Sequence, residues 1–297
     1  MSMKEGVLII DKPPGMTSHD VVNRVRRVSG IRRVGHAGTL DPLATGVLLL
    51  CLGRATRLVE YLVGHTKTYE ATVRLGQTTD TYDADGKVVA ERPSAGITTA
   101  AINEAMSKFR GRIRQRPPIY SAIKQQGQPL HKLARRGEEV EAPVRDVTIY
   151  ELTLLAWSPP ELHLRMVCSS GTYVRSLAHD LGEALGCGGH VTALRRTAVG
   201  PFTVGDALPL GKLTPDNLAD HLQPMDVAVS HLPRLELTAA AAAQMQQGQR
   251  LAREANQPVG PLARAYDLDG RFMGVLESTE YGWRPRKVIL PATEQDS

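Results

Sequence analysis

The segment from Gly35 to Leu48 concentrates residue types that can do chemistry. It places one carboxylate, Asp41, among three glycines, two threonines and a proline. Glycine and proline at this density predict a loop whose backbone takes shapes that other residues cannot adopt. The apolar run 47–52 follows at once and indicates a buried strand or the start of a helix. A single carboxylate on a stiff loop anchored in the core suits a nucleophile.

The rest of the chain narrows this chemistry. An aspartate in a glycine-rich loop, taken alone, is more often a surface turn whose carboxylate bonds its own backbone. The three cysteines lie far apart and the nine histidines lack metal-ligand spacing, so no zinc site or disulfide framework is indicated. Residues 83–86 resemble the start of a calcium loop. Thr81 and Arg92 occupy the first and last ligand positions, however, and this excludes a calcium site.

Composition and charge bound the class of protein. The chain has 297 residues, of which 42% are hydrophobic and 23% charged, as expected for one large or two smaller globular domains. Its net charge of +5 favours a polyanionic partner. The apolar stretch 7–10 is too short for a signal peptide, and no run approaches transmembrane length. The sequence therefore predicts a cytoplasmic protein without membrane contact.

Hydrophobic periodicity predicts the elements that must position Asp41. Residues 6–10 indicate a short strand, and Thr17-Ser18-His19-Asp20 is typical of a helix start, with Gly30 as its stop. Alternating apolar residues predict half-buried strands over 69–75 and 162–168. A helix is expected after 169–172. Arg175 lies in its first turn, off an inner face made by Val174, Leu177, Ala178, Leu181 and Leu185.

Positive charge gathers in the middle of the chain. Residues 108–116 carry a cation at every second position, which would line one face of an extended segment. Two prolines end this run, and residues 117–145 are predicted to form a basic excursion. Residues 205–233 are interpreted as a connecting region. Residues 234–291 indicate a small β-rich module, marginal unless it packs on the larger part.

Five blocks, taken together and in order, resemble the TruB family of tRNA pseudouridine synthases. Each block alone is a weak signal, but the occurrence of all five in the family's order over residues 6–202 is highly specific. The blocks are Gly6-Val-Leu-Ile-Ile-Asp-Lys-Pro-Pro-Gly-Met-Thr-Ser18, the Asp41 loop, Lys67-Thr-Tyr-Glu-Ala-Thr-Val-Arg-Leu-Gly76 with Thr79-Asp-Thr-Tyr-Asp-Ala-Asp-Gly86, Arg116-Pro-Pro-Ile-Tyr-Ser-Ala-Ile-Lys124, and Cys168-Ser-Ser-Gly-Thr-Tyr-Val-Arg-Ser-Leu177 through Leu194-Arg-Arg196.

The resemblance implies the fold and the activity. The implied fold is α+β, with a mixed, mainly antiparallel sheet in a catalytic domain over residues 1–230, followed by a small PUA-like RNA-binding module over 231–297. The implied activity is the isomerisation of uridine-55 in the T loop of tRNA to pseudouridine. No metal or cofactor is implied. The expected partner is the T arm of tRNA, and a monomer without an obligate protein partner is expected.

The same resemblance assigns roles at the catalytic centre. Asp41 matches the family's nucleophile, and Arg175 matches the arginine that pairs with it. Tyr69 matches the aromatic residue that stacks on the flipped base and is a candidate for proton removal. From the residues alone, Tyr69 is better explained as a core residue, because it opens an alternating strand. Attack on the base carbon, attack on the sugar carbon and stabilisation of an elimination intermediate all stay open for Asp41.

Further matches concern the RNA. His36 matches a residue that enters the RNA and helps to hold the target base out of the stack. Tyr173 and Leu194 match pocket-lining positions, and Lys12 is expected among the substrate-binding residues, stiffening the catalytic region from behind. His131 stands where the family often has tyrosine. The predicted phosphate contacts are Arg110, Arg112, Arg114, Lys124 and Arg136.

Two other functions compete with this interpretation. A tRNA-binding or tRNA-folding protein without catalysis would need the basic surface but not Asp41, Tyr69 and Arg175 together. A guide-RNA-dependent pseudouridine synthase would share the site. That branch usually carries longer lysine-rich extensions, whereas this chain has a short acidic-polar tail, so a stand-alone enzyme is favoured.

Overall fold

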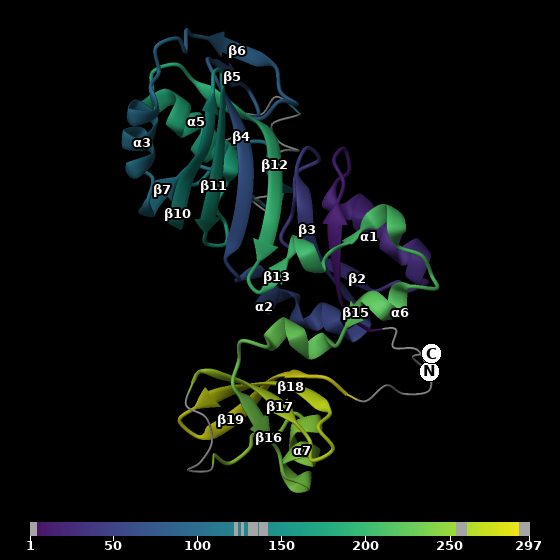
Figure 1. The fold of residues 1–297 in the computed structure, drawn as a ribbon. Helices are drawn as coiled ribbons and strands as arrows, with labels where there is room; N and C mark the ends of the chain where they lie inside the picture. Colours follow the sequence, from purple (N-terminus) through teal and green to yellow (C-terminus); the bar gives the residue numbers. More distant parts are fainter. Residues whose placement is uncertain are drawn as a thin grey trace.

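The fold is built on one large mixed sheet with helices on it and a smaller sheet beside it (Figure 1). This computed structural model describes residues 5–121, 124–125, 128–129, 136, 142–253 and 260–290. The large sheet has the order β14-β1-β3-β12-β4-β11-β10-β7, with β2, β13 and β15 paired off this path. Most neighbours run antiparallel, so the α+β prediction with a mainly antiparallel sheet is confirmed.

The sheet consists of two halves that meet at one short parallel contact. Strands β3 and β12 pair only through Thr45 with Arg195 and Gly46 with Arg196. One half is formed by the N-terminal strands, with β14 and β15 at its edge, and the other by β4, β7, β10, β11, β12 and β13. The strands are β1 (Gly6–Lys12), β2 (Val34–Ala37), β3 (Thr45–Leu52), β4 (Lys67–Leu75), β7 (Gly111–Gln115), β10 (Arg145–Ser158), β11 (Glu161–Cys168), β12 (Gly189–Val199) and β13 (Phe202–Thr203).

Three helices cover one face of both halves and share a single hydrophobic core. They are α1 (Ser18–Ser29), α3 (Thr99–Ser107) and α5 (Val174–Ala184). Helix α1 begins and ends where the sequence predicts, because Thr17 and Asp20 form a capping box and Gly30 takes the left-handed conformation, with φ 70°. The predicted inner face of α5 lies in that core, with Leu177, Ala178 and Leu181 buried.

The opposite face of β1 and β3 carries a second core. Buried residues of η1 (Gly53–Leu58), α2 (Val59–Val63) and η4 (Met225–Val229) pack against it. Because β3 is covered on both sides, seven of its eight residues are buried, and the apolar run 47–52 is a strand and not a helix start. The remaining short elements of this part are β5 (Gln77–Thr79), β6 (Val88–Glu91), β8 (Lys124–Gln125), β9 (Gln128–Pro129), η2 (Val204–Asp206), η3 (Leu210–Lys212) and α6 (Leu218–His221).

Residues 205–233 do more than connect, which corrects the sequence interpretation. Strand β14 (Leu208–Pro209) pairs with β1 in parallel, and β15 (Leu222–Gln223) pairs with it antiparallel. These two-residue strands are too short to leave an alternating pattern in the sequence. They close the free edge of β1, which stabilises the half of the sheet that carries the Asp41 loop.

The C-terminal residues form a separate small sheet below the large one in Figure 1. Its order is β16-β17-β18-β19, with α7 against it. Val275 joins the second core, and Lys287 and Arg286 pair with Glu60 of α2, so the module docks through apolar and charged contacts. The elements are β16 (Arg234–Glu236), α7 (Ala239–Gln246), β17 (Leu262–Tyr266), β18 (Phe272–Thr279) and β19 (Gly282–Val288). Among the described residues, no helix combines the length and apolar character needed to cross a bilayer.

Candidate active site

A cavity of about 510 Å³ lies where the two halves of the sheet meet, on the face covered by the helices. This volume is within the range of ligand sites and suits one nucleotide. Asp41 comes from one half, and Tyr69 and Arg175 come from the other. The sequence-predicted residues that line the cavity are His36, Asp41, Tyr69, Tyr173, Arg175 and Leu194.

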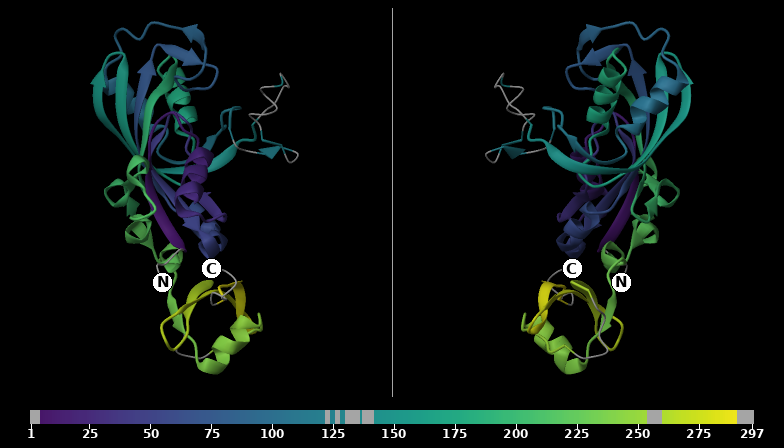
Figure 2. Two further views of the ribbon diagram at one scale, coloured as in Figure 1. Left: turned by 90° about the vertical axis from the view of Figure 1, so that its right-hand side faces the viewer. Right: turned by 90° about the vertical axis from the view of Figure 1, so that its left-hand side faces the viewer.

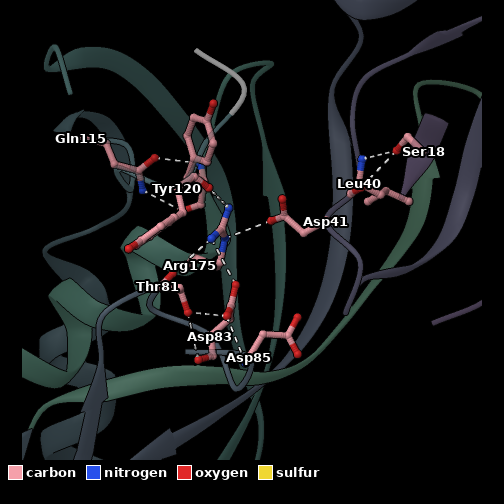
Figure 3. Close-up of polar contacts among 10 residues, drawn as sticks. Ser18, Leu40, Asp41, Thr81, Asp83, Asp85, Gln115, Tyr120 and Arg175 are labelled. Atoms are coloured by element: carbon pink, nitrogen blue, oxygen red, sulfur yellow. Dashed lines mark hydrogen bonds and ion pairs between the residues drawn. The ribbon is translucent and has the colours of Figure 1, made fainter. Parts of the chain in front are cut away.

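The Asp41 loop connects β2 to β3 and is held from behind. Ser18, the first residue of α1, brackets Leu40: its hydroxyl accepts from the Leu40 amide at 2.8 Å and donates to the Leu40 carbonyl at 3.1 Å (Figure 3). Gly46 has φ 98°, and a side chain there would overlap the carbonyl oxygen of Arg196. Glycine at this position therefore permits the close approach of β3 and β12 that brings the two halves together.

Arg175 is buried and has four partners within the site (Figure 3). Its Nε lies 2.9 Å from Oδ2 of Asp41, and its Nη1 lies 3.1 Å from Oδ2 of Asp83. The guanidinium also donates to the carbonyl oxygens of Thr81 at 3.1 Å and Tyr120 at 3.0 Å. One planar cation is thus shared by two carboxylates and aimed by two carbonyls, a geometry that a lysine cannot reproduce.

The pKa of the Asp41 carboxyl is subject to opposing influences. Burial is the largest and raises the pKa of the Asp41 carboxyl above its usual value. The Arg175 guanidinium lowers this pKa, and the neighbouring Asp83 carboxylate raises it. The Asp41 side chain still exposes 36% of its surface, toward the cavity. A carboxylate that is poorly solvated yet open to a ligand is a competent nucleophile.

Asp83 is a second carboxylate of this site, and the sequence assigned it no role there. Its side chain is 6% exposed. Besides Arg175, its carboxylate accepts from the Thr81 hydroxyl at 2.5 Å and from the Asp85 amide at 3.2 Å. The signal in the sequence was the dense Thr-Asp-Thr-Tyr-Asp-Ala-Asp-Gly block, but nothing in that block tells which carboxylate turns inward.

Arg196 is a second residue that the sequence did not single out. It is 1% exposed, and its guanidinium donates to the carbonyls of Val47 at 2.7 Å and Gly38 at 3.1 Å. It therefore ties β12 to both ends of the Asp41 loop. Burial raises the pKa of the Tyr69 phenol, and the charge of Arg196 acts in the opposite direction.

The other predicted pocket residues lie around the same cavity. His36 in β2 is half-buried, and burial, followed by the charges of Arg196 and His19, lowers its pKa, so its ring is neutral near pH 7. The backbone of Tyr173 is bracketed by the Gln115 amide, through bonds of 2.8 and 3.0 Å. Gln115 thereby holds the backbone of Tyr173, the residue directly before the first residue of α5, Val174.

Lys12 is not among the residues that line the cavity, although it was expected among the substrate-binding residues. Its side chain is buried, and its ammonium donates to the carbonyls of Pro13, Met16 and Pro42 at 2.9, 2.6 and 3.2 Å. All three donors are therefore engaged behind the Asp41 loop. Burial lowers the pKa of Lys12 to about 8. This geometry fits the expected stiffening of the catalytic region and not contact with substrate.

The predicted phosphate contacts divide into three groups. Arg110 is exposed, but its guanidinium donates to the Leu152 carbonyl at 2.9 and 3.2 Å, so part of its hydrogen-bonding capacity is already used. Arg112 and Arg114 lie on the exposed side of β7, with Arg112 3.0 Å from Asp146. Lys124 lies in β8, although its side chain is outside the described part, and Arg136 is exposed and bonds Gln128. His131 falls outside the described residues.

No group of three or more histidine, cysteine or acidic side chains suited to a metal ion occurs within the part of the chain that the structure describes. The three free cysteines are buried. For Cys51 and Cys168, burial raises the thiol pKa to about 12 and about 11, so these thiols are not poised as nucleophiles.

Comparisons with known proteins identify the family of this chain. The model of the TruB family pseudouridylate synthase N-terminal domain matches residues 26–174. Two TruB C-terminal models, of tRNA pseudouridylate synthase B and of pseudouridine synthase II, match residues 175–230 and 233–289. The tRNA pseudouridine synthase B of Azoarcus sp. (strain BH72) is 46% identical over 98% of this chain and 97% of its own length. That of Burkholderia pseudomallei (strain 668) is 44% identical over 96% and 97%.

Solved structures match the fold over nearly the whole chain. An H/ACA RNP bound to a substrate RNA containing 2′-deoxyuridine gives a TM-score of 0.75 at 27% identity, covering 98% of this chain and 87% of the other. A Cbf5-Nop10-Gar1 complex gives 0.76 at 28% identity, with the same coverage. Fold and site together define a pseudouridine synthase. The chain belongs to the TruB family of pseudouridylate synthases.

Proposed function

We propose that this chain isomerises uridine-55 in the T loop of tRNA to pseudouridine. The observation that carries the proposal is the buried Arg175 guanidinium, which lies between Asp41 and Asp83 at the wall of a nucleotide-sized cavity. The relatives that cover nearly the whole chain at 44–46% identity carry the name tRNA pseudouridine synthase B. The position in the tRNA follows from the resemblance of the five sequence blocks.

The reaction divides among the residues of the cavity. The bond between N1 of uracil and C1′ of ribose breaks, the base turns, and C5 bonds to the same sugar carbon. C5 loses a proton and N1 gains one, so atoms and electrons balance without an oxidant or a reductant. Asp41, aimed and kept ionised by Arg175, supplies the nucleophile or charge stabiliser. Tyr69 lines the cavity from β4 and is the candidate for removing the proton from C5.

The target uridine must leave the stack before this chemistry can occur. A base inside a folded loop is unreachable until it is extruded into a pocket. His36 is placed for the wedge role because it lines the same cavity from β2 and its neutral ring can leave water at small cost. Tyr173 and Leu194 complete the walls of the cavity around the extruded base.

Grip on the rest of the T arm is assigned to the basic surfaces. Arg112, Arg114 and Arg136 are exposed and suit phosphate contacts. We place the boundary between the catalytic part and a C-terminal RNA-binding module near residue 231, between η4 and β16. The enzyme acts in the cytoplasm as a monomer and without a guide RNA or protein partner. Its structural neighbours include an H/ACA RNP and a Cbf5-Nop10-Gar1 complex, but its nearly full-length relatives carry the name of a tRNA enzyme.

The test uses pure protein and an unmodified tRNA transcript, with no other RNA or protein present. Pseudouridine should form at one site, and a transcript with cytidine at that site should give none. Asp41→Asn should abolish the product and keep tRNA affinity within about tenfold, because it removes the nucleophile and not the phosphate contacts. Asp216→Asn, an exposed aspartate outside the cavity, is the matched control. Binding without product by wild-type protein would favour the tRNA-folding alternative, and product only with added guide RNA would favour the guided one.

A further inference from the structure

Tyr82 has an uncommon backbone conformation next to the active site. Among the described residues it is the one non-glycine residue with a positive φ, at 61°. This left-handed region is disfavoured for a bulky side chain and persists only where surrounding contacts impose it. Such positions cluster at functional sites, so the contacts that hold Tyr82 are informative.

The two neighbours of Tyr82 are both partners of Arg175. The carbonyl of Thr81 accepts from Nη1 of Arg175 at 3.1 Å, and the carboxylate of Asp83 lies 3.1 Å from the same atom (Figure 3). An ordinary extended tyrosine would direct these two groups differently, since φ at residue 82 sets the relative orientation of the peptides on either side. The turn at Tyr82 therefore lets consecutive residues converge on one guanidinium.

Strand β12 holds the backbone of this turn. The Val191 amide donates to the Tyr82 carbonyl at 3.0 Å, and the Ala84 amide donates to the Val191 carbonyl at 2.9 Å. These bonds fix the segment on the sheet, yet they leave the tyrosine side chain to be placed by something else.

The tyrosine ring is placed by the helix that also carries Arg175. It stacks on the ring of His179, with centroids 4.0 Å apart and planes 10° apart. His179 follows Arg175 by four residues in α5, so both side chains project from the same side of the helix, one turn apart. The stack and the ion pair thus join the 79–86 loop to α5 at two adjacent points.

We infer that Tyr82 and His179 are positioning residues for the Asp41–Arg175–Asp83 arrangement. By clamping the loop to α5, the stack keeps Thr81 and Asp83 on Arg175, and this fixes the guanidinium against Asp41. The expected effect on catalysis rests on the proposed function. The Tyr82–His179 stack, called the clamp below, also predicts a change that can be measured without substrate.

That change is in the titration of Asp41. The charged groups that act on it are Arg175 of α5, Asp83 of the loop and Lys12 behind it. Arg175 is the largest of these influences and lowers the pKa of Asp41, so loosening Arg175 should raise it. Around the stack itself stand Asp180 and Glu183 of α5 and Arg116 after β7. Burial and then Asp180 raise the pKa of Tyr82 above its usual value, so its phenol does not titrate near the acid limb.

The experiment compares Tyr82→Asn with Tyr82→Phe. Asparagine tolerates the left-handed conformation but provides no ring, whereas phenylalanine keeps the ring and the stack. With Tyr82→Asn, we expect single-turnover pseudouridine formation to slow roughly 10- to 100-fold, tRNA affinity to stay within about threefold, and the acid limb of the rate to move to higher pH. Tyr82→Phe should keep the wild-type rate and the wild-type acid limb. In free protein, the carboxyl-carbon NMR signal of Asp41, assigned by its loss in Asp41→Asn, should titrate at higher pH in Tyr82→Asn.

Two further variants complete the design. His179→Leu removes the other ring of the stack and should repeat the effects, which keeps the test decisive if Tyr82→Asn fails to fold. Tyr150→Asn, an exposed tyrosine of β10, is the matched control and should behave as wild type. A wild-type rate and Asp41 titration in Tyr82→Asn or His179→Leu would overturn the inference. A lower melting temperature with an unchanged acid limb would also overturn the inference, because it would indicate a purely structural role. An inactive wild-type protein would instead refute the proposed function, and the NMR titration would still judge the clamp.

Discussion

The Nε atom of Arg175 lies 2.9 Å from Oδ2 of Asp41, although the two residues belong to different halves of the sheet. Asp41 follows β2, and Arg175 opens a helix that packs on β12 and β4. The proposed active site is therefore assembled by the short parallel contact between β3 and β12. Any change that shifts one half relative to the other should act first on this ion pair.

Arg175→Lys should lose most activity while the protein stays folded. A lysine ammonium is a point charge and cannot contact Asp41, Asp83 and the Thr81 and Tyr120 carbonyls from one plane. We expect single-turnover product formation to fall at least about 100-fold, as misplacement of a catalytic group commonly costs. Arg92→Lys, at an exposed ion pair with Glu183, is the control for the substitution type. Near-normal turnover by Arg175→Lys would place this residue outside the site.

Asp41→Asn should raise thermal stability at neutral pH. The folded-state pKa of Asp41 is raised mainly by burial, so the folded protein binds more protons than the unfolded chain between the two pKa values. The free energy of unfolding therefore falls as pH rises through this window, and the charged form opposes folding above it. Asparagine removes that cost. Melting curves without RNA should show a higher melting temperature for the variant at pH 7, with the gap closing as the pH falls toward 4 and below.

The exposed Asp216→Asn variant should show no such gap. A lower melting temperature for Asp41→Asn at pH 7 would mean that the ion pair with Arg175 outweighs burial, contrary to the direction expected here.

RNA affinity should depend steeply on salt, with contributions that differ along β7. The Arg114 side chain has no hydrogen bond or ion pair within the described part of the chain. Arg110 is also exposed, but its guanidinium donates to the Leu152 carbonyl through two bonds. Each phosphate contact adds roughly 0.7 to 0.9 to the slope of log affinity against log salt. Arg114→Gln should thus reduce the slope by about one, and Arg110→Gln should leave it unchanged. Equal slopes in both variants and wild type, from filter binding over a salt series, would show that β7 faces away from the RNA.

Local signals in the sequence predicted the elements well. The capping box at Thr17, the stop at Gly30 and the alternation in β4 and β11 depend on residues within a few positions of one another. Such patterns report backbone propensity and the buried face directly.

Partners distant in the sequence were not predictable in this way. Arg196 donates to Gly38, 158 residues away, and Arg175 donates to Thr81, 94 residues away. Neither contact leaves a periodic trace, because each depends on how β12 and α5 pack in three dimensions. Arg175 was correctly placed off the apolar face of its helix, yet it is buried, because the carboxylates of Asp41 and Asp83 compensate its charge there.

His36 and Tyr69 line one cavity but should act at different steps, and this separates a base-flipping enzyme from a binder with a similar motif. A wedge acts before chemistry, whereas a base-contacting tyrosine acts after extrusion. A fluorescent base analogue placed next to the target uridine reports unstacking, and product formation is measured in the same samples. Tyr69→Phe should give a wild-type unstacking signal with little product, because the ring remains and the phenol is lost. His36→Ala should give a weaker or slower signal and a proportional loss of product.

The controls for this last experiment are His221→Ala in α6 and Tyr150→Phe in β10, both exposed and outside the cavity, which should match wild type in both readouts. The expected dissociation of the two signals arises because extrusion needs only a side chain that fills the gap in the RNA stack, while proton removal needs a specific atom. If His36→Ala alone unstacks normally, the wedge lies elsewhere in residues 35–40. If both variants keep wild-type unstacking and wild-type turnover, neither residue has the role assigned to it, even though the family and its activity would stand.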